Sequence, residues 1–338
     1  MPASRPDMKV RASSIAACLL LSLATSVAAQ RGGAGQGVRE VTVTAIPGVV
    51  AAGATWSTAW QGTDNADGLV GTPDGGLLFA QEQPRRISKL DVMDRASVFL
   101  SDTHGVGSIG IDSKGRVIAV ERTCTDPGGH PESCNELTAV SVLTPTRVVL
   151  VDRFEGKPLG RLNDLVVDAK GGVYFTVGGA YYAGPSGVIK SLGEDLRTNG
   201  VTLSRDETIV YVTNGNAIVA FDILPDGGVT NRRNFATLEA GGNGDGMAID
   251  DVGRLYVTSA SGVQVFSPEG TYLGLIPTPR PAISVAFSGA GKRTLYIVGS
   301  GALGPDGQEF TTPDGVRNNA KTIYRLPMIA AGFSGRPK

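Results

Sequence analysis

Histidine, cysteine and tryptophan are scarce in this chain of 338 residues, which holds only 2, 3 and 2 of them. Two histidines, His104 and His130, are too few for a histidine-rich zinc or copper site. The sequence also has no G-x-S-x-G elbow, no H-E-x-x-H pair, no P-loop and no dinucleotide-binding glycine pattern. These absences set aside the enzyme classes that depend on such motifs.

An excess of charge of one sign is missing as well. The 31 basic and 32 acidic residues give a formal net charge of −1, and no run of basic residues is present. Such a balance argues against a nucleic acid or an anionic membrane as a partner. No stretch keeps a helical periodicity over three turns.

Long hydrophobic runs are absent too, because the apolar stretch at residues 15–23 is too short to span a bilayer comfortably. Basic residues precede this stretch and small residues at 27–29 follow it, which is typical of a secretory signal peptide. We therefore predict that residues 1–29 are a signal peptide, that residues 30–40 are a flexible lead-in, and that the protein is exported to the periplasm or outside the cell. Without residues 1–29 the net charge becomes −3, and we expect no membrane association.

Two cysteines, Cys124 and Cys134, remain after residue 29, and both lie in the polar segment TCTDPGGHPESCNE. Export to an oxidising compartment would permit a disulfide between them, and two free thiols are the alternative. A metal site is less favoured there because His130 is the nearby soft ligand and stands alone.

Glycine is abundant, with 47 residues, about twice the usual share. It falls at turns between short apolar runs, and similar segments begin roughly 35 to 55 residues apart. The six segments are DGLVGTPDGGLLFA from Asp67, GSIGIDSKGRVIAV from Gly107, NDLVVDAKGGVYFT from Asn163, NGVTLSRDETIVYV from Asn199, DGMAIDDVGRLYVT from Asp245 and ISVAFSGAGKRTLYIV from Ile283. Each predicts a β-hairpin with a turn of Asp, Gly or other turn-forming residues.

Six such units predict an all-β fold, a six-bladed β-propeller over residues 41–330. The ring must close to protect its strand edges. Residues 41–46 alternate enough to form a strand, and we expect them to pair with residues 322–326 so that both ends of the chain build the last blade.

A residue at the head of each unit would meet the central channel; these head residues are Asp67, Gly107, Asn163, Asn199, Asp245 and Ser284. Four of the six carry carboxylate or amide oxygens, which are ligands for hard cations such as Ca²⁺, Mg²⁺ or Mn²⁺. Taken singly, Asn-Gly and Asp-Gly are ordinary turn chemistry. Their recurrence at one register favours a cation site that includes Asp245 and Asn199.

The runs RLNDLVVDAKGGVYFT, TNGVTLSRDETIVYVTN, GDGMAIDDVGRLYVTSASGVQVFSPEG and AFSGAGKRTLYIV resemble the senescence marker protein/gluconolactonase/luciferin-regenerating enzyme superfamily, above all its bacterial gluconolactonase-like members. The resemblance covers roughly residues 68–326. It implies a propeller with a divalent cation in its channel, most often Ca²⁺, with Zn²⁺, Mn²⁺ or Mg²⁺ as alternatives. It also implies hydrolysis of a small lactone or a related cyclic ester.

Residue by residue, the resemblance assigns Asn199 and Asp245 as direct metal ligands and Asn163 as a residue beside the metal that touches substrate or water. The third ligand of the family is a glutamate, where this chain has the shorter Asp67. Glu121 matches a glutamate of the second blade and is a candidate substrate contact.

The implied mechanism has the cation polarise the lactone carbonyl while Asp245 steers or deprotonates the attacking water and Asn163 orients it or a substrate hydroxyl. Asp164 should point away from the channel by strand alternation and be structural. His104 is either an exposed loop residue or a substrate contact. A different class of function stays open: a non-catalytic exported propeller that binds a carbohydrate, peptide or protein. A strictosidine synthase-like or lyase-type propeller is a third reading.

Overall fold

The computed structural model describes residues 1–2, 37–122, 138–314 and 316–336. The chain divides into Met1–Gly33 and Ala34–Lys338, and the strands all belong to the second unit. They form six four-stranded antiparallel sheets and one two-stranded ribbon. The predicted six-bladed β-propeller is therefore confirmed.

The six sheets follow the chain in order, and each is numbered here as a blade. Blade 1 holds β2 (Asp67–Gly71), β3 (Leu77–Gln81), β4 (Arg86–Leu90) and β5 (Ala96–Leu100), and blade 2 holds β6 (Val106–Ile111), β7 (Val117–Glu121), β8 (Ala139–Val142) and β9 (Val148–Val151). The ribbon of β10 (Arg153–Phe154) and β11 (Lys157–Pro158) precedes blade 3, which holds β12 (Leu165–Val167), β13 (Val173–Thr176), β14 (Ala180–Ala183) and β15 (Ile189–Gly193). Blade 4 holds β16 (Val201–Leu203), β17 (Ile209–Asn214), β18 (Ala217–Ile223) and β19 (Val229–Thr237), and blade 5 holds β20 (Met247–Ile249), β21 (Leu255–Ser259), β22 (Gly262–Phe266) and β23 (Tyr272–Pro277). Blade 6 holds β24 (Ala282–Ser288), β25 (Thr294–Ser300), β26 (Lys321–Pro327) and, from the other end of the chain, β1 (Ser57–Gly62).

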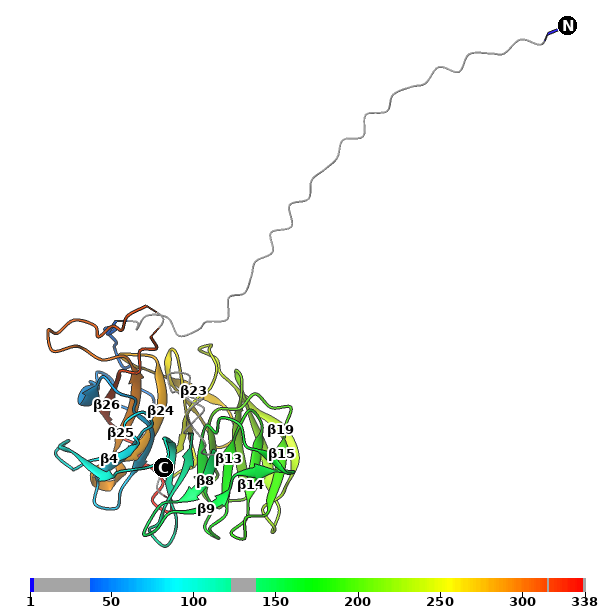
Figure 1. Cartoon of the computed structure of the whole chain (residues 1–338). Coiled ribbons are helices and arrows are strands. Elements are labelled where there is room, and N and C mark those ends of the chain that lie inside the picture. The colour runs from blue at the N-terminus through cyan, green and yellow to red at the C-terminus, as the bar shows by residue number, and fades with distance from the viewer. Residues whose placement is uncertain (3–36, 123–137, 315, 337–338) are drawn as a thin grey trace. The chain divides into compact units, whose positions relative to one another are not determined.

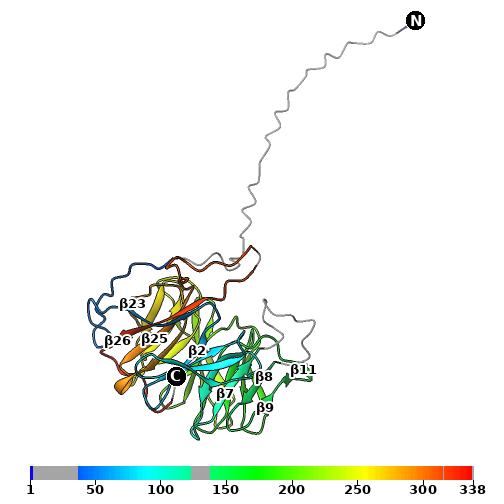
Figure 2. The same cartoon turned by 60° about the vertical axis from the view of Figure 1, so that its left-hand side comes forward.

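The innermost strands of the blades form a closed ring. Strand β2 contacts both β6 and β24, and the contacts continue through β12, β16 and β20 back to β24. Figure 1 shows β13, β14 and β15 side by side in one blade, and Figure 2 shows β7, β8 and β9 in another. Because each head residue lies within two residues of the start of an innermost strand, closure of the ring gathers these residues around one axis.

Apolar side chains fill each interface between neighbouring blades. Six clusters of buried residues are present, and each combines side chains from two adjacent blades. Phe79 and Leu69 of blade 1, for example, pack with Val298 of blade 6. Both faces of most strands are therefore covered, which explains why short runs such as LLFA are apolar without alternation.

The ring closes at blade 6 through a strand from the N-terminal side, as expected, but the strand is not the predicted one. Strand β1 pairs antiparallel with β26, from Ser57 opposite Arg325 to Gly62 opposite Lys321. Residues 41–45 form no strand, and a bridge joins Ile46 to Val50. The alternation of residues 41–46 instead reflects packing, because Val43 and Ile46 are buried in the cluster between blades 5 and 6.

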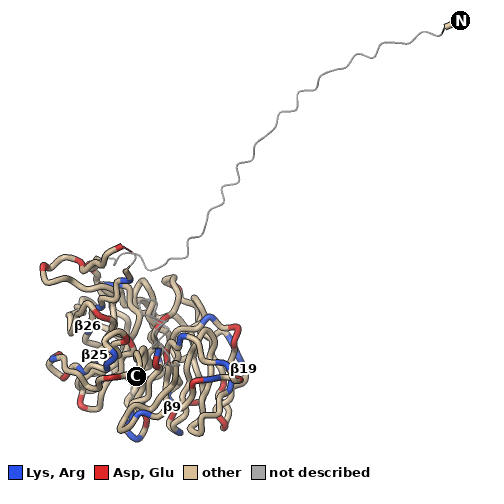
Figure 3. Tube along the Cα trace, in the orientation of Figure 1, with Lys and Arg blue, Asp and Glu red and all other residues tan. Residues whose placement is uncertain are grey.

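Aspartate side chains lock several of the hairpin turns. In blade 5, Asp250 accepts hydrogen bonds from the backbone of Val252 and Arg254 and from the Arg254 Nε at 2.6 Å. Asp112 and Arg116 repeat this arrangement in blade 2. Such pairs mix the two signs of charge along the chain, as Figure 3 shows for this view.

The residues after β26 cross the ends of the inner hairpins opposite the head residues. The Gly332 N–H donates to the Lys292 carbonyl in blade 6, and the Phe333 N–H donates to the Ile249 carbonyl in blade 5. Arg336 then donates to the Leu203 carbonyl in blade 4 at 2.7 Å. Residues 331–336 therefore join three blades at that end of the ring.

Candidate functional site

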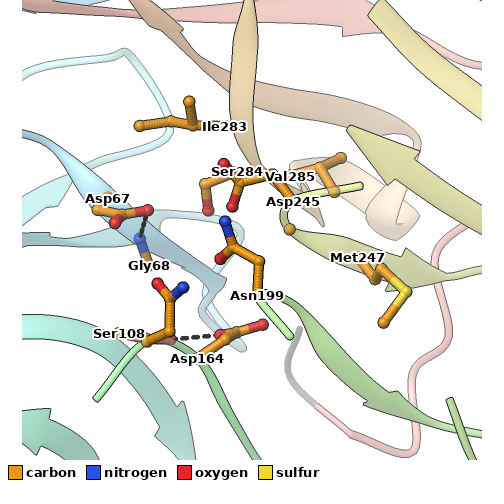
Figure 4. Close-up of a pocket in the computed structure, with 12 residues that line it drawn as sticks. Asp67, Gly68, Ser108, Asp164, Asn199, Asp245, Met247, Ile283, Ser284 and Val285 are labelled. Atoms are coloured by element: carbon orange, nitrogen blue, oxygen red, sulfur yellow. Dashed lines mark hydrogen bonds between the residues drawn. The ribbon is translucent and has the colours of Figure 1, made fainter. Parts of the chain in front are cut away.

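A cavity lies at the centre of the ring, where the innermost strands begin. Its lining, called the head cavity below, consists of Asp67, Gly68, Ser108, Asn163, Asp164, Asn199, Asp245, Gly246, Met247, Ile283, Ser284 and Val285. Five of the six head residues are in this lining, and the sixth, Gly107, is next to Ser108. The recurrence of polar residues at one register of the sequence thus becomes a ring of oxygen donors (Figure 4).

Buried threonines fix the backbone of the donor residues in blades 3, 4 and 5. The Asn199 N–H donates to the Thr213 hydroxyl at 2.9 Å, and the Thr176 hydroxyl donates to the Asn199 carbonyl at 2.5 Å. The Thr258 hydroxyl donates to the carbonyl of Gly246 at 3.1 Å. Since these backbones are held from behind, their side chains project into the cavity with little freedom.

Asp245 lies deep in the protein and faces other negative charges. Its pKa is raised well above the usual range, first by burial and then by the carboxylates of Asp67 and Asp164, while Arg122 offsets this only in part. A carboxylate in such surroundings gains strongly from a nearby cation.

The amides of Asn163 and Asn199 are the neutral donors and acceptors of the site. Backbone groups of both residues are hydrogen-bonded, but neither side-chain amide forms a hydrogen bond to another described residue. Figure 4 shows the Asn199 side chain pointing toward Asp245 and Ser284. Both amides are therefore placed to meet a ligand in the cavity.

Asp164 lines the cavity, so the prediction that it points away from the channel is wrong. Its Oδ1 accepts from the Ser108 hydroxyl at 2.7 Å and the Leu165 N–H at 2.9 Å, and its Oδ2 accepts from the Val201 N–H at 3.1 Å. Alternation fails here because Asp164 precedes the first residue of β12, where the backbone is not yet pleated. Asp164 connects blades 2, 3 and 4, so its hydrogen bonds are structural.

The donor set suits a hard divalent cation. In the part of the chain that the structure describes, no three His, Cys, Asp or Glu side chains are grouped to hold a metal ion. The head cavity instead combines the carboxylates of Asp67 and Asp245 with the amide of Asn199. This all-oxygen set matches the preference of Ca²⁺ or Mg²⁺, and a cation would relieve the repulsion on Asp245.

Two predicted substrate contacts lie outside the cavity lining. Glu121 is fully buried, and its carboxylate accepts from the Ser141 hydroxyl at 2.6 Å and from Arg147 at 2.8 Å. It also accepts from the backbone N–H of His104 at 3.2 Å. The structure therefore joins Glu121 and His104 within blade 2 and not with the head residues. The predicted pair Cys124 and Cys134 falls outside the described residues.

A charged cluster beside Asp67 was not foreseen from the sequence. Arg122 donates to the Asp67 carboxylate at 3.3 Å and lies 3.5 Å from Glu82, which Arg161 binds with two nitrogens at 2.8 and 2.9 Å. One signal was available, because Gly107 is the one head residue without a side chain.

Residues 50–301 match the model of a protein family described as the SMP-30/gluconolactonase/LRE-like region. Similar curated proteins include the gluconolactonase of Zymomonas mobilis, 32% identical over an alignment of 192 residues that covers 48% of this chain and 54% of that protein. The lactonase drp35 of Staphylococcus aureus is 35% identical over 136 residues, or 35% of this chain and 42% of that protein. The chain thus spans about half the length of the curated relatives it matches.

Solved structures share the fold at lower identity. A gluconolactonase of Xanthomonas campestris superposes with a TM-score of 0.68 at 23% identity, covering 88% of this chain and 98% of that one. A luciferin-regenerating enzyme gives 0.64 at 18%, covering 83% and 99%. These likenesses support the propeller architecture.

Proposed function

The chain belongs to the SMP-30/gluconolactonase/LRE-like family, and from this membership we propose that it is a hydrolase that opens a small lactone with the help of a divalent cation. The observation that carries the proposal is the ring of oxygen donors at one end of the channel, with Asp245 facing two further carboxylates. Relatives named gluconolactonase and lactonase support the substrate class.

Asp67, Asn199 and Asp245 are the residues that would hold the cation, with Ca²⁺ as the first candidate. When bound, a divalent cation supplies Lewis-acid polarisation of a carbonyl and lowers the pKa of water. The half-buried position of these side chains keeps them in contact with the cavity while the protein around them excludes bulk water. Such surroundings strengthen each electrostatic contact with the substrate.

The proton chemistry is assigned to Asp245. Its carboxylate orients the attacking water and accepts its proton. A bound cation would lower the pKa of Asp245 and of the water, so Asp245 and the cation would share the activation of the water. Asp164 is not a base here because its two oxygens hold neighbouring blades.

Asn163 is assigned to substrate orientation. Its backbone carbonyl accepts from Arg122 at 2.8 Å and its N–H donates to the Thr176 carbonyl, so the residue is fixed while its amide faces the cavity. An amide both donates and accepts, which suits a substrate hydroxyl or the attacking water. Sugar lactones carry such hydroxyls and are the substrate class we propose.

Export of the protein is part of the proposal. The signal-peptide pattern of residues 1–29 supports it, although residues 3–36 lie outside the described residues. Among the described residues, no helix is long and apolar enough to cross a membrane.

The test is lactone hydrolysis by the purified protein, followed with a pH indicator on a panel of sugar and aliphatic lactones. The protein is treated with a chelator and then given Ca²⁺, Zn²⁺, Mn²⁺ or Mg²⁺. Turnover that one ion restores supports the proposal and identifies the ion. A folded protein that binds an ion but opens no lactone contradicts the substrate class. A folded protein that binds no ion and opens no lactone favours the non-catalytic binding propeller.

A further inference from the structure

Arg122 fills the place that a head residue would occupy in blade 2. Its side chain is 6% exposed, and it follows β7 at the end of the inner hairpin. A Cβ built on Gly107 would lie 1.6 Å from the Nε of Arg122 and 1.9 Å from its Cζ. No residue larger than glycine fits at position 107 while Arg122 stays in place, so the two positions form one unit. Blade 2 contributes a guanidinium to the ring instead of an oxygen donor.

The guanidinium spans three blades at this point. One terminal nitrogen donates to the Asp67 carboxylate of blade 1 at 3.3 Å and to the Asn163 carbonyl of blade 3 at 2.8 Å. The other lies 3.5 Å from Glu82. Arg122 therefore has a fixed position next to the head cavity.

Asp67 is the nearer of the two described carboxylates that contact Arg122. Glu82 has a second partner, Arg161, which binds both of its oxygens at 2.8 and 2.9 Å. That bidentate pair is shorter than the 3.5 Å contact of Glu82 with Arg122. Among the described residues, Glu82 is thus held mainly by Arg161, and Asp67 is the nearer carboxylate partner of Arg122.

A divalent cation at Asp67 would have to share this carboxylate with a guanidinium. Two positive charges on either side of one carboxylate repel each other strongly in a half-buried site, and a chelated cation also draws the carboxylate away from the arginine. Asp245 has no arginine or lysine within salt-bridge distance among the described residues, so Arg122 acts on its carboxylate only from a longer distance.

We propose that Arg122 is an internal competitor for the Asp67 carboxylate, which weakens cation binding at the head cavity and leaves Asp245 as the dominant charged ligand. The inference rests on the proposed cation site and adds a residue that controls its affinity. Arg122 acts through Asp67 and is a positioning residue. Its removal should tighten cation binding, whereas removal of an ordinary structural arginine should leave binding unchanged or weaken it.

The experiment is a double-mutant cycle on the full chain with Arg122→Gln, Asp67→Asn and the double variant, each titrated with Ca²⁺ by calorimetry. Arg254→Gln is the matched control, because Arg254 is also a mostly buried arginine paired with an aspartate, at the far end of the inner hairpin of blade 5. We expect Arg122→Gln to lower the Kd for Ca²⁺ about tenfold, since one charge contact at short range is of this order. Arg254→Gln should leave the Kd within about twofold of the parent value.

The cycle locates the effect at Asp67. In the parent protein, Asp67→Asn should raise the Kd for Ca²⁺ less than about threefold, because Arg122 already binds the Asp67 carboxylate. In the Arg122→Gln background, Asp67→Asn should raise this Kd about tenfold or more. An unchanged or higher Kd in folded Arg122→Gln protein overturns the inference while the proposed function stands. If Arg122→Gln does not fold, a large loss of Ca²⁺ affinity on Asp67→Asn alone overturns it, and a small loss supports it. If neither the parent nor Arg122→Gln binds Ca²⁺, both the cation part of the proposed function and this inference fail.

Discussion

Asp245 and Asp164 line the same cavity, but their surroundings predict opposite effects of the same substitution on stability. The Asp245 carboxylate is buried near two other carboxylates, and its pKa is raised. A carboxyl group whose folded pKa exceeds its unfolded value binds protons more tightly in the folded state. Above the unfolded pKa it therefore destabilises the fold, and this cost grows until the pH passes the folded pKa. A chelator removes any cation that could offset the destabilising effect of the Asp245 charge. Under that condition, replacing Asp245 by asparagine should remove this destabilising effect.

The size of the effect follows from the pKa. Each pH unit by which the folded pKa is raised corresponds to about 1.4 kcal/mol of unfolding free energy. The raised pKa of Asp245 therefore predicts that Asp245→Asn increases the unfolding free energy and the Tm of the chelated protein. Acidification of the chelated parent protein toward the unfolded pKa should recover the same free energy.

Asp164→Asn should act in the other direction. The Asp164 carboxylate accepts three hydrogen bonds, from Ser108, Leu165 and Val201. An amide keeps one acceptor oxygen and points an N–H₂ group toward a buried donor. Loss of a charged acceptor costs about 1.5–3 kcal/mol, and an unsatisfied donor adds to it. We expect a net loss of about 2–4 kcal/mol, with or without a cation.

The assay is urea or thermal unfolding of the parent and the two variants at pH 7, with a chelator and with saturating Ca²⁺. Ca²⁺ at 100 times its Kd should stabilise the parent by about 2.7 kcal/mol, and Asp245→Asn should lose most of that gain. The reasoning is refuted if Asp245→Asn lowers the stability of the chelated protein as Asp164→Asn does, because its carboxylate would then be a satisfied structural group.

Three further outcomes follow from the structure. Asn199→Ala should abolish cation-dependent turnover while the circular dichroism spectrum stays unchanged, because its amide has a ligand role and its backbone bonds to Thr213 remain; retained turnover would remove Asn199 from the site. Burial lowers the pKa of Lys292 to about 8, so between about pH 8 and 10.5 the unfolded chain binds more protons and this residue makes stability rise with pH. Urea unfolding should show an unfolding free energy about 1 kcal/mol higher at pH 9.5 than at pH 7.5, after allowance for the partial exposure of Lys292. Lys292→Met should abolish this difference. Arg336→Ala should lower the unfolding free energy by about 2–4 kcal/mol, because it leaves the buried Leu203 carbonyl without its 2.7 Å donor. Calorimetry should show an unchanged Ca²⁺ affinity, because Leu203 and Asn199 lie at opposite ends of the same inner-strand segment.

The repeat in the sequence carried most of the fold. Asp67, Asn163, Asn199 and Asp245 begin equivalent hairpins, and equivalent positions in a closed ring must face one axis, so their meeting could be predicted without coordinates. The closing strand could not be predicted in this way. Residues 41–46 alternate between apolar and polar side chains, but a segment with this pattern can bury its apolar side chains without forming a strand. Val43, for example, is buried by packing between two blades.

Interactions that cross between blades also escaped the sequence. Asp164 and Leu165 are adjacent in the chain, whereas Ser108 and Val201 reach Asp164 only because the ring closes. The same is true of Arg122, which contacts residues of blades 1 and 3. Hairpin periodicity describes one blade at a time and holds no information on the neighbour that a side chain will meet.

Departures from the repeat are the better guide to specialised residues in such a ring. Six identical blades would give six identical head residues and a symmetric channel, which cannot orient a substrate with different groups at each end. Gly107 breaks the pattern of polar head residues, and the structure shows the reason, since Arg122 needs its space. In blades 3 to 5 the threonines Thr176, Thr213 and Thr258 recur and hold donors in place. Five blades offer side-chain oxygens to the ring and blade 2 offers a guanidinium, and this asymmetry gives the cavity a direction along which one small molecule can be polarised.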